Sequence, residues 1–438
     1  MTALPEIRHG RSRLGQATEI LHSILTDTRA PADHLIDQYF RAHRQMGSKD
    51  RAFAAETVYG CLRRKAELKA LAAPCLPAEL DAEQHAYWLV ATYVLKYSGW
   101  SARALMEAGF QGDAEALVMR VRSVKTADLP FAVRINLPDW LAEKLLTQFG
   151  EAGTVELSEA LNHPAQVGIR ANTLRTSRDA LAEKLAAEDY PCIPMKYSPL
   201  GLQRDKRGPM FNTQAFKEGL FELQDEGSQL LALMTEAAPK EKVVDFCAGA
   251  GGKTLALAAM MQNTGVLNAY DVAVNRLEKM KPRLARAGAY NAQAFPIRDE
   301  HEAILDKYAG TADAVLVDAP CSGTGTLRRN PDIKWRPIDL TMLTRLQASI
   351  LEAASKLVKP GGRLVYATCS LLDEENSAIT SAFLAKHPEF QVMQASQILE
   401  RQGAKVPEGL GGDGALRLLT HKHGTDGFYA LAMRRGKG

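Results

Sequence analysis

The stretch KVVDFCAGAGGKTLALAAMM, residues 242–261, decides the fold class of this chain of 438 residues. A short apolar run leads into a turn of glycines and alanines and then into a helical pattern, which predicts a strand, a tight turn and a helix. Glycine lets the backbone approach a ligand closely, and the start of a helix offers unpaired N–H groups. The stretch therefore predicts a nucleotide-type binding loop at the carboxyl end of a parallel strand.

This loop departs from two common phosphate-binding patterns. GKT at residues 252–254 resembles the end of a P-loop, but Cys247 stands where that motif needs its first glycine. The dinucleotide spacing GxGxxG also fails, because Gly249 and Gly251 are not followed by a glycine at position 254. The next strand, VLNAYDV, carries Asp271 about 20 residues beyond the loop, where a carboxylate accepts hydrogen bonds from ribose hydroxyls. On spacing alone, an S-adenosylmethionine site and a structural glycine turn both remain open.

The rest of the C-terminal half repeats the alternation of apolar runs with helices or loops. This pattern predicts a parallel, doubly wound α/β sheet with a Rossmann-like arrangement over residues 237–438. The runs that support it are GVLNAYDVAVNRLEKMKPRLARAG, AQAFPIRD, ADAVLVDAPC and GGRLVYATCS.

Two further segments precede this domain. Residues 1–130 repeat apolar side chains at helical spacing and predict an all-helical bundle. The composition shifts near Leu129 and Pro130, and residues 131–236 predict a small α/β module in which short β-branched runs alternate with helices. In that module, IRANTLRTS carries Arg170 and Arg175, which we expect either to contact RNA or to lie on a solvated edge strand.

Composition excludes several classes of protein. The net charge of +3 neither requires nor excludes nucleic acid. The most apolar stretch, residues 86–95, covers about half the length that a bilayer needs, and the N-terminal sequence lacks an export signal, so we expect a cytoplasmic protein without membrane association. No CxxC pair occurs, which argues against a metal site and against a secreted disulfide framework. The six cysteines are at positions 61, 75, 192, 247, 321 and 369.

Two of these cysteines follow predicted strands directly. Cys321 stands in DAPCSG after the strand AVLVD, and Cys369 stands in TCS after the strand RLVYA. Loops at the carboxyl ends of neighbouring parallel strands meet at one edge of the sheet, so we expect the two thiols to converge beside the glycine loop. Buried packing groups, a disulfide and a pair of catalysts are the alternatives, and the position of the thiols beside a predicted cofactor loop favours catalysis.

Taken together, CAGAGGKT, VLVDAPCSGTGTLRRNPDIKW and ATCS resemble, in order and spacing, the RNA (cytosine-5)-methyltransferase family. The flanking segments LQDEGSQL and THKHGTDGFYALAM are also similar to that family, and GSKDRAFAAETVYGCLRRK resembles the NusB-like RNA-binding domain of its bacterial RsmB-type members. The resemblance covers nearly the whole chain. It implies a class I methyltransferase domain and S-adenosylmethionine-dependent methylation of cytosine C5 in RNA, with small-subunit ribosomal RNA as substrate.

The resemblance also implies roles for single residues. A thiolate that adds to C6 of cytosine makes C5 nucleophilic, and the attacking cysteine of the family corresponds to Cys369. Cys321 corresponds to the cysteine that helps release the methylated base. Asp318 would hydrogen-bond the N3 edge of the cytosine, and Lys253 is a source of the positive charge that favours a thiolate.

By the same resemblance, the cofactor would be held by the glycine loop and by acidic residues at the ends of the next strands. Two departures from the family pattern concern this site: Ala250 stands where the family usually has proline, and Arg298 precedes rather than follows the aspartate of FPIRD. We expect the alanine to make the loop more flexible with binding intact. The predicted cofactor residues are Cys247, Ala248, Gly249, Ala250, Gly251, Gly252, Lys253, Asp271 at the ribose, Arg276, Asp299 at the adenine, and Asp318.

The segment after Cys321 is basic and aromatic, which suits phosphate contacts and stacking on an unpaired RNA base. The predicted contacts are Arg328, Arg329, Lys334 and Trp335, with a surface loop around a structural tryptophan as the alternative. A DNA cytosine methyltransferase would need a Glu-Asn-Val motif, which the sequence lacks. An RNA-binding protein without catalysis would be expected to have lost a catalytic residue. A monomer suffices for the chemistry, and we expect one.

Overall fold

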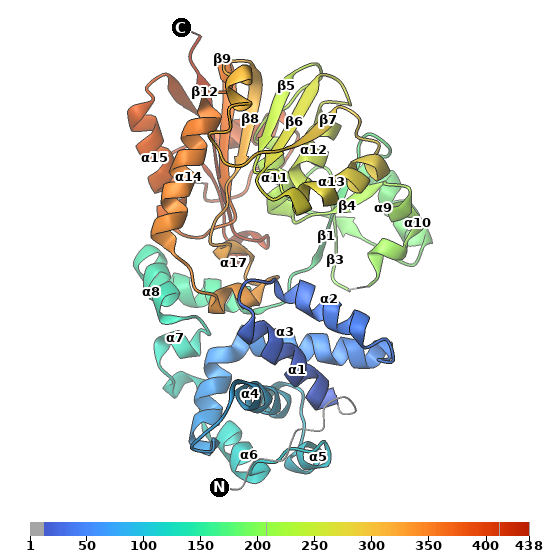
Figure 1. The fold of residues 1–438 in the computed structure, drawn as a ribbon, viewed down its shortest axis with the longest axis vertical. Helices are drawn as coiled ribbons and strands as arrows, with labels where there is room; N and C mark the ends of the chain where they lie inside the picture. Colours follow the sequence, from blue (N-terminus) through green and yellow to red (C-terminus); the bar gives the residue numbers. More distant parts are fainter. Residues whose placement is uncertain (1–12, 207, 411, 438) are drawn as a thin grey trace. The chain divides into compact units, whose positions relative to one another are not determined.

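The computed structural model describes residues 13–206, 208–410 and 412–437 (Figure 1). The chain divides into two compact units, Met1–Pro164 with Leu327–Ile338, and Ala165–Thr326 with Asp339–Gly438. These units differ from the expected segments 1–130, 131–236 and 237–438. The predicted module is split at residue 164, and a short segment that follows Cys321 in the sequence belongs to the first unit.

The first unit is helical over its described residues. Its apolar side chains repeat at helical spacing, so one face of each helix contributes to a shared core that includes Leu14, Leu62 and Val90. The helices are α1 (Arg13–Thr26), α2 (Ala32–Ala42), α3 (Ser48–Ala72), α4 (Ala82–Tyr97), α5 (Ala102–Glu107), α6 (Ala114–Ser123), α7 (Phe131–Arg134) and α8 (Asp139–Asn162), with short turns at η1 (Ala73–Cys75) and η2 (Thr126–Asp128). The expectation of a helical N-terminal region is confirmed, whereas its likeness to NusB remains a prediction.

The segment Leu327–Ile338 is anchored in this unit by a buried lysine. Lys334, in the turn η6 (Pro331–Trp335), is 1% exposed. Its ammonium donates to the main-chain oxygens of Arg63 at 3.2 Å and Asn136 at 3.1 Å, and to Oδ1 of Asn162 at 2.6 Å. Burial, together with repulsion from neighbouring arginines, lowers the pKa of Lys334 well below its usual value. An ammonium enclosed in this way is not available to a phosphate, so the predicted RNA contact of Lys334 is wrong.

The neighbouring predicted RNA contacts are also engaged within the first unit. The indole N–H of Trp335 donates to the carbonyl oxygen of Leu62 at 2.7 Å, and the Lys65 ammonium lies 4.9 Å from the centroid of its ring. Arg328 is 8% exposed, and its carbonyl oxygen accepts a hydrogen bond from Arg63. Trp335 is therefore the structural tryptophan of the alternative interpretation, and Arg328 is buried rather than presented to RNA. Arg329 is partly exposed and remains a prediction.

The second unit begins with a small antiparallel sheet in the order β2-β3-β1-β4. Its strands are β1 (Val167–Ala171), β2 (Ile193–Pro194), β3 (Gly201–Arg204) and β4 (Phe221–Leu223), accompanied by α9 (Arg178–Ala187), η3 (Met210–Asn212) and α10 (Gln214–Lys217). A core around Ile169, Leu185 and Phe221 holds the strands and helices together.

The two predicted arginines differ in exposure: Arg170 of β1 is buried, whereas Arg175, in the turn after β1, is exposed and its contact with RNA remains a prediction. Arg170 lies on β1, which pairs with both β3 and β4, so the strand is central and not an edge. Its side chain is 2% exposed and donates to Oε1 of Gln224 at 2.6 Å. Arg175 donates to the carbonyl oxygen of Ala287 at 3.0 Å, which satisfies the end of helix α13 (Val274–Ala287). The predicted RNA contact of Arg170 is wrong, and Arg175 has a capping role.

The large sheet of the second unit confirms the predicted doubly wound fold. Its order is β10-β12-β9-β8-β5-β6-β7, with β11 paired to β12. Strands β5 to β9 are parallel and β12 is antiparallel to β9. The strands are β5 (Lys242–Phe246), β6 (Val266–Asp271), β7 (Ala292–Pro296), β8 (Ala312–Asp318), β9 (Val358–Thr368), β10 (Phe390–Met393), β11 (Leu416–Leu418) and β12 (Phe428–Arg435).

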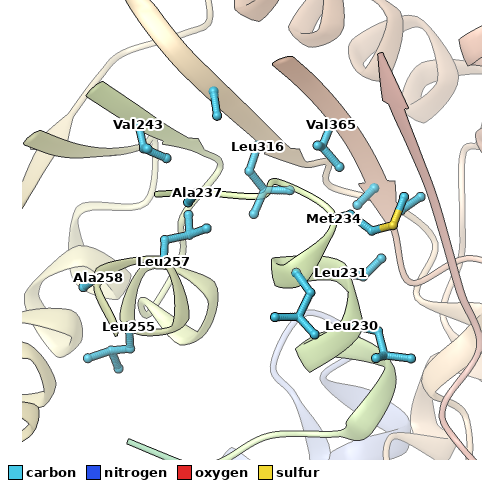
Figure 2. Close-up of a cluster of buried hydrophobic side chains, with 14 of the residues drawn as sticks. Leu230, Leu231, Met234, Ala237, Val243, Leu255, Leu257, Ala258, Leu316 and Val365 are labelled. Carbon is cyan, nitrogen blue, oxygen red and sulfur yellow. The ribbon is translucent and has the colours of Figure 1, made fainter. Parts of the chain in front are cut away.

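Helices cover both faces of this sheet, as a parallel sheet requires. The remaining elements are α11 (Glu226–Leu233), α12 (Gly252–Met260), η4 (Leu305–Tyr308), η5 (Thr324–Thr326), α14 (Leu340–Ser355), η7 (Asp373–Glu375), α15 (Ser377–Lys386), α16 (Ala395–Arg401) and α17 (Thr420–His423). On one face, Leu231 of α11 and Leu257 of α12 belong to the same core as Leu316 and Val365 of the strands (Figure 2). Strand neighbours of opposite orientation, such as Val315, form a second core with α14 and α15.

The strand order places a switch point between β5 and β8. The chain runs from β5 outward through β6 and β7 and then returns to the other side of β5 as β8. In such sheets ligands bind outside the carboxyl ends of the strands at this point. Across the described ranges, no helix is both long and apolar enough to span a membrane.

We predict that Lys334→Met destabilises the first unit by about 2–3 kcal/mol, because it leaves three buried acceptors without a donor. All four tryptophans belong to this unit, so urea unfolding followed by tryptophan fluorescence reports on it selectively; they are Trp88, Trp100, Trp140 and Trp335. The exposed lysine variant Lys69→Met is the control and should unfold like the wild type. Equal midpoints for the two variants would contradict the anchoring role of Lys334.

Candidate active site

The glycine loop after β5 is held by main-chain geometry. Cys247, Gly249 and Gly251 have φ angles of 70°, 55° and 85°, in the left-handed region. Asp271, at the end of β6, fixes the loop, because its Oδ2 accepts from the N–H of Gly249 at 2.7 Å and its Oδ1 from that of Ala273 at 2.7 Å. Since β5 and β6 pair with Phe246 beside Tyr270, this loop and this carboxylate leave the sheet at the same level.

The glycines of the loop differ in what surrounds them. A Cβ at Gly249 would lie 2.5 Å from Nη2 of Arg276, and one at Gly251 would lie 2.4 Å from Cγ of Met280. At Gly252, the first residue of α12, a Cβ would meet nothing within 4 Å. The first two glycines are therefore needed for packing, whereas Gly252 borders an open space at the N-terminus of a helix.

The loop is also held from the side by an arginine that the sequence analysis missed. Nη1 of Arg283, on α13, donates to the carbonyl oxygen of Ala250 at 2.5 Å. The same guanidinium pairs with Glu222 of β4, with Nη2 2.9 Å from Oε2, and Glu222 also pairs with Arg286. The side chain of Glu222 is 6% exposed, so this network is largely protected from solvent. The alanine in place of proline is thus supported by an external hydrogen bond.

Asp299 lies in the exposed turn after β7. Its Oδ1 accepts from the N–H of His301 at 2.9 Å, while Arg298 pairs with Glu302, with Nε 2.7 Å from Oε2. The turn keeps the Asp299 carboxylate at the carboxyl end of its strand. Its contact with adenine remains a prediction.

The two cysteine loops converge, as predicted. Sγ of Cys321 lies 3.4 Å from Sγ of Cys369, and both are free thiols. The strands before them pair in parallel with Asp318 beside Ala367, and the carbonyl oxygen of Cys369 accepts from the N–H of Gly325 at 2.9 Å. The hydrogen bond with Cys369 and burial raise the pKa of Cys321 well above its usual value. The protonated form of Cys321 is therefore favoured.

An ion pair joins the glycine-loop helix to the first cysteine loop. Nζ of Lys253 lies 2.6 Å from Oδ2 of Asp318, and the two side chains are 11% and 32% exposed. Burial alone would lower the pKa of Lys253, but the charge of Asp318, its hydrogen bond, and smaller contributions from Cys369 and Asp245 together outweigh burial. The net result is a raised pKa, so Lys253 keeps its positive charge close to the thiols.

A second residue missed in the sequence analysis lies beneath this pair. Asp245 of β5 is 0% exposed; its Oδ2 accepts from the Thr254 hydroxyl at 2.6 Å, and its Oδ1 has no hydrogen-bond partner. Burial, with repulsion from Asp318 and Asp271, raises the pKa of Asp245 to about 7. The signal in the sequence was a carboxylate inside an apolar strand, where a charge is costly.

A third missed residue is Glu375, which is fully buried between the two cysteine loops. It follows the Thr-Cys-Ser motif in the acidic run Asp373–Glu375, which the sequence analysis did not single out. No group of three or more histidine, cysteine, aspartate or glutamate side chains is placed to hold a metal ion in the parts of the chain that the structure describes.

A doubly wound sheet with a glycine loop after its first strand and an acidic residue after its second defines the class of S-adenosylmethionine-dependent methyltransferases, and comparison with known proteins narrows this class. Residues 232–434 match the family model 16S rRNA methyltransferase RsmB/F, and residues 137–210 match the ferredoxin-like domain of RsmF/B-like methyltransferases. The ribosomal RNA small subunit methyltransferase B of Thermus thermophilus is 31% identical over 402 residues, which cover 88% of this chain and 89% of that protein. The chain belongs to the RsmB/F family of 16S rRNA methyltransferases.

Other relatives agree with this assignment. A probable ribosomal RNA small subunit methyltransferase B of Bacillus subtilis is 28% identical over 419 residues, 89% of this chain and 92% of that protein. Among solved structures, a methyltransferase homolog protein from Pyrococcus horikoshii is similar, with a TM-score of 0.60 and 28% identity. The match covers 71% of this chain and 100% of the Pyrococcus chain. The fold alone is shared with NSun6 from the same organism, solved with SFG, an analogue of S-adenosylmethionine, at a TM-score of 0.60 and 23% identity over 69% of this chain and 99% of that one.

We predict that Asp245→Asn changes how stability depends on pH. The folded pKa of about 7 lies above the ordinary value of 3.8, so the wild type loses stability as pH rises from about 4 to about 7 and no further above that. The asparagine variant lacks this titration. The melting temperature of the variant minus that of the wild type should therefore rise by a few degrees, on the order expected for a single buried group, as the pH is raised from 5 to 7.5. A constant difference across this range would contradict the raised pKa.

Proposed function

We propose that this chain transfers a methyl group from S-adenosylmethionine to C5 of a cytosine in small-subunit ribosomal RNA, through a covalent bond between Cys369 and C6. The single observation that carries the proposal is the contact of two free thiols, 3.4 Å apart, at the ends of neighbouring strands. The ion pair of Lys253 with Asp318 lies beside them. Methylation of an exocyclic amine or of a ribose hydroxyl needs no thiol nucleophile and would not require the two cysteines.

The residues around the glycine loop fit the cofactor. Gly252 borders open space at the start of α12, where helix N–H groups favour an anionic group such as a carboxylate. Oδ2 of Asp271 accepts from the loop N–H of Gly249 and Oδ1 from the N–H of Ala273, and each oxygen keeps another acceptor site for a ribose hydroxyl. Arg276 and Asp299 complete the proposed cofactor set. When bound, S-adenosylmethionine supplies an electrophilic methyl group on a positively charged sulfur.

The electrostatics support Cys369 as the nucleophile. The raised pKa of Cys321 favours its protonated form, and the cation of Lys253 lies near Cys369, where positive charge would assist a nucleophilic thiolate. Addition forms the Sγ–C6 bond and moves the C5–C6 electron pair toward N3 and C5. Asp318 and Lys253 would stabilise the charge that develops at the N3 edge. The same asymmetry argues against the arrangement of a DNA cytosine methyltransferase, in which the Pro-Cys cysteine attacks.

Release requires the reverse bond changes. The proton on C5 is removed, its electron pair re-forms the C5–C6 double bond, and the Sγ–C6 pair returns to Cys369. We assign the base of this step to Cys321: its thiol first gives its proton to solvent, and the thiolate then takes the C5 proton, since a thiol of high pKa gives the more basic thiolate. Its contact with Cys369 places it beside the bond that breaks.

We predict that Cys369→Ser lowers the methylation rate by at least about 10³-fold, because the nucleophile is lost. Cys321→Ala should instead accumulate a protein–RNA adduct, because addition proceeds but release does not. Radiolabelled 16S ribosomal RNA incubated with each variant and S-adenosylmethionine, then run on a denaturing gel, would show the adduct as a retarded band. An adduct in Cys369→Ser, or full activity of that variant, would reverse the assignment.

The reaction product and its position are tested by bisulfite sequencing of ribosomal RNA from cells with and without this protein. We expect one cytosine to lose its protection from deamination in the cells that lack it. Unchanged patterns in small-subunit RNA would refute the proposed substrate.

We predict that Arg283→Met weakens S-adenosylmethionine binding about tenfold, because the Ala250 carbonyl loses its charged donor. Isothermal titration calorimetry measures this affinity directly. The second change Ala250→Pro stiffens the backbone of the loop and should recover part of the loss in the double variant. If Arg283→Met bound the cofactor as tightly as the wild type, the Arg283 hydrogen bond would have no role in shaping the loop.

A further inference from the structure

The buried carboxylate of Glu375 connects the two cysteine loops. Oε1 accepts from the main-chain N–H of Ser322 at 2.8 Å and from Nε2 of Gln347 at 2.9 Å. Oε2 accepts from the hydroxyl of Ser322 at 2.5 Å and from the hydroxyl of Ser370. Ser322 follows Cys321 in the sequence and Ser370 follows Cys369, so a single side chain is bonded to the residue after each thiol.

The two serines are also bonded to each other and to the chain around them. Their hydroxyl oxygens lie 3.1 Å apart, and both lie 3.2 Å from the hydroxyl of Thr324. That threonine accepts from the main-chain N–H of Leu371 at 2.9 Å. The hydroxyls can donate to only one partner each, and the carboxylate is the strongest acceptor among them. Glu375 therefore decides how these hydroxyls are oriented.

Glu375 is itself held in place by its backbone and its neighbour. The Tyr366 hydroxyl donates to its carbonyl oxygen at 2.7 Å. Asn376 donates from Nδ2 to the carbonyl oxygen of Ser370 at 2.9 Å and accepts at Oδ1 from the Thr368 hydroxyl at 2.5 Å. Because Thr368 and Ser370 flank Cys369, the attacking residue is fixed on both sides by the turn that carries Glu375.

We propose that Glu375 is a positioning residue that sets the separation of the two thiols. The catalytic consequence rests on the proposed function: C5 and C6 are bonded neighbours, so the groups that act on them must lie in contact. A carboxylate is suited to this because it accepts from four donors, whereas the amide of glutamine brings donors of its own against the Ser322 N–H. Burial of the charge is tolerated because its acceptor sites are filled.

The separation of the thiols can be measured without any RNA. In the full-length protein treated with diamide, the Cys321–Cys369 disulfide should form quickly, because the sulfur atoms are already 3.4 Å apart. Quantitative mass spectrometry of the linked peptides gives the rate. We expect Glu375→Gln to slow this reaction about tenfold and Glu375→Ala to slow it further, since hydrogen bonds to a charged group are lost.

A matched control separates positioning from general damage. Glu226 is another buried glutamate of the second unit, 6% exposed, and it accepts from the main-chain N–H groups of Tyr197 and Ser198. Glu226→Gln should leave the disulfide rate unchanged even if it lowers the melting temperature as much as Glu375→Gln does. Circular dichroism and melting curves confirm that each variant is folded, and Glu375→Gln serves if Glu375→Ala does not fold.

Steady-state kinetics test the catalytic part of the inference. Glu375→Gln should lower kcat by up to about 100-fold with KM for RNA and affinity for S-adenosylmethionine unchanged, the pattern of a small misplacement of reacting groups. Wild-type disulfide rate in a folded Glu375→Gln variant overturns the positioning role, and unchanged kcat overturns its catalytic consequence. Failure of the proposed function would appear elsewhere, as the absence of an adduct in Cys321→Ala, while the disulfide rate would still report on Glu375.

Discussion

The site depends on the parallel pairing of β8 with both β5 and β9. This pairing sets Phe246 beside Val317 and Asp318 beside Ala367, so the chain leaves all three strands at one edge of the sheet. Residues far apart in the sequence then become neighbours: the loop that begins at Cys247, the Cys321 loop and the Cys369 loop. A shift of one residue in either pairing would turn the side chains of that strand to the opposite face and separate the loops. The two cores on the faces of the sheet hold this register.

Buried charge is concentrated at this same edge. Asp318 and Asp245 lie near the cation of Lys253, Glu375 lies between the two cysteine loops, and the surroundings of the three carboxylates differ. Asp318 is paired with the lysine, Glu375 is surrounded by hydrogen-bond donors, and burial, with repulsion from Asp318 and Asp271, raises the pKa of Asp245 to about 7. The positive charge of Lys253 is thus held against Asp318, close to Cys369, where the proposed addition would develop charge.

The RNA contacts were the weakest part of the sequence interpretation. Lys334 was predicted to contact RNA because it is basic and follows the Cys321 motif, and Arg170 because it was expected to face outward from a strand, but both side chains are buried and donate to acceptors of the protein itself. Composition cannot distinguish a cation that faces solvent from one that satisfies buried carbonyl groups, since both are basic residues between apolar ones. The distinction depends on which distant main-chain oxygens approach, as those of Arg63 and Asn136 do around Lys334.

The sequence by itself determined the alternation of strands and helices, the glycine loop at residues 247–253 and the two cysteine motifs, because these follow from periodicity and from residue types at fixed local spacing. It also placed Asp271 and Asp318 at strand ends. Only the tertiary structure decided that Leu327–Ile338 joins the helical unit, that Arg283 holds Ala250, and that Glu375 lies between the cysteine loops. These features rest on contacts between residues distant in the chain, whose partners are fixed by strand order and packing and leave no mark in the local pattern.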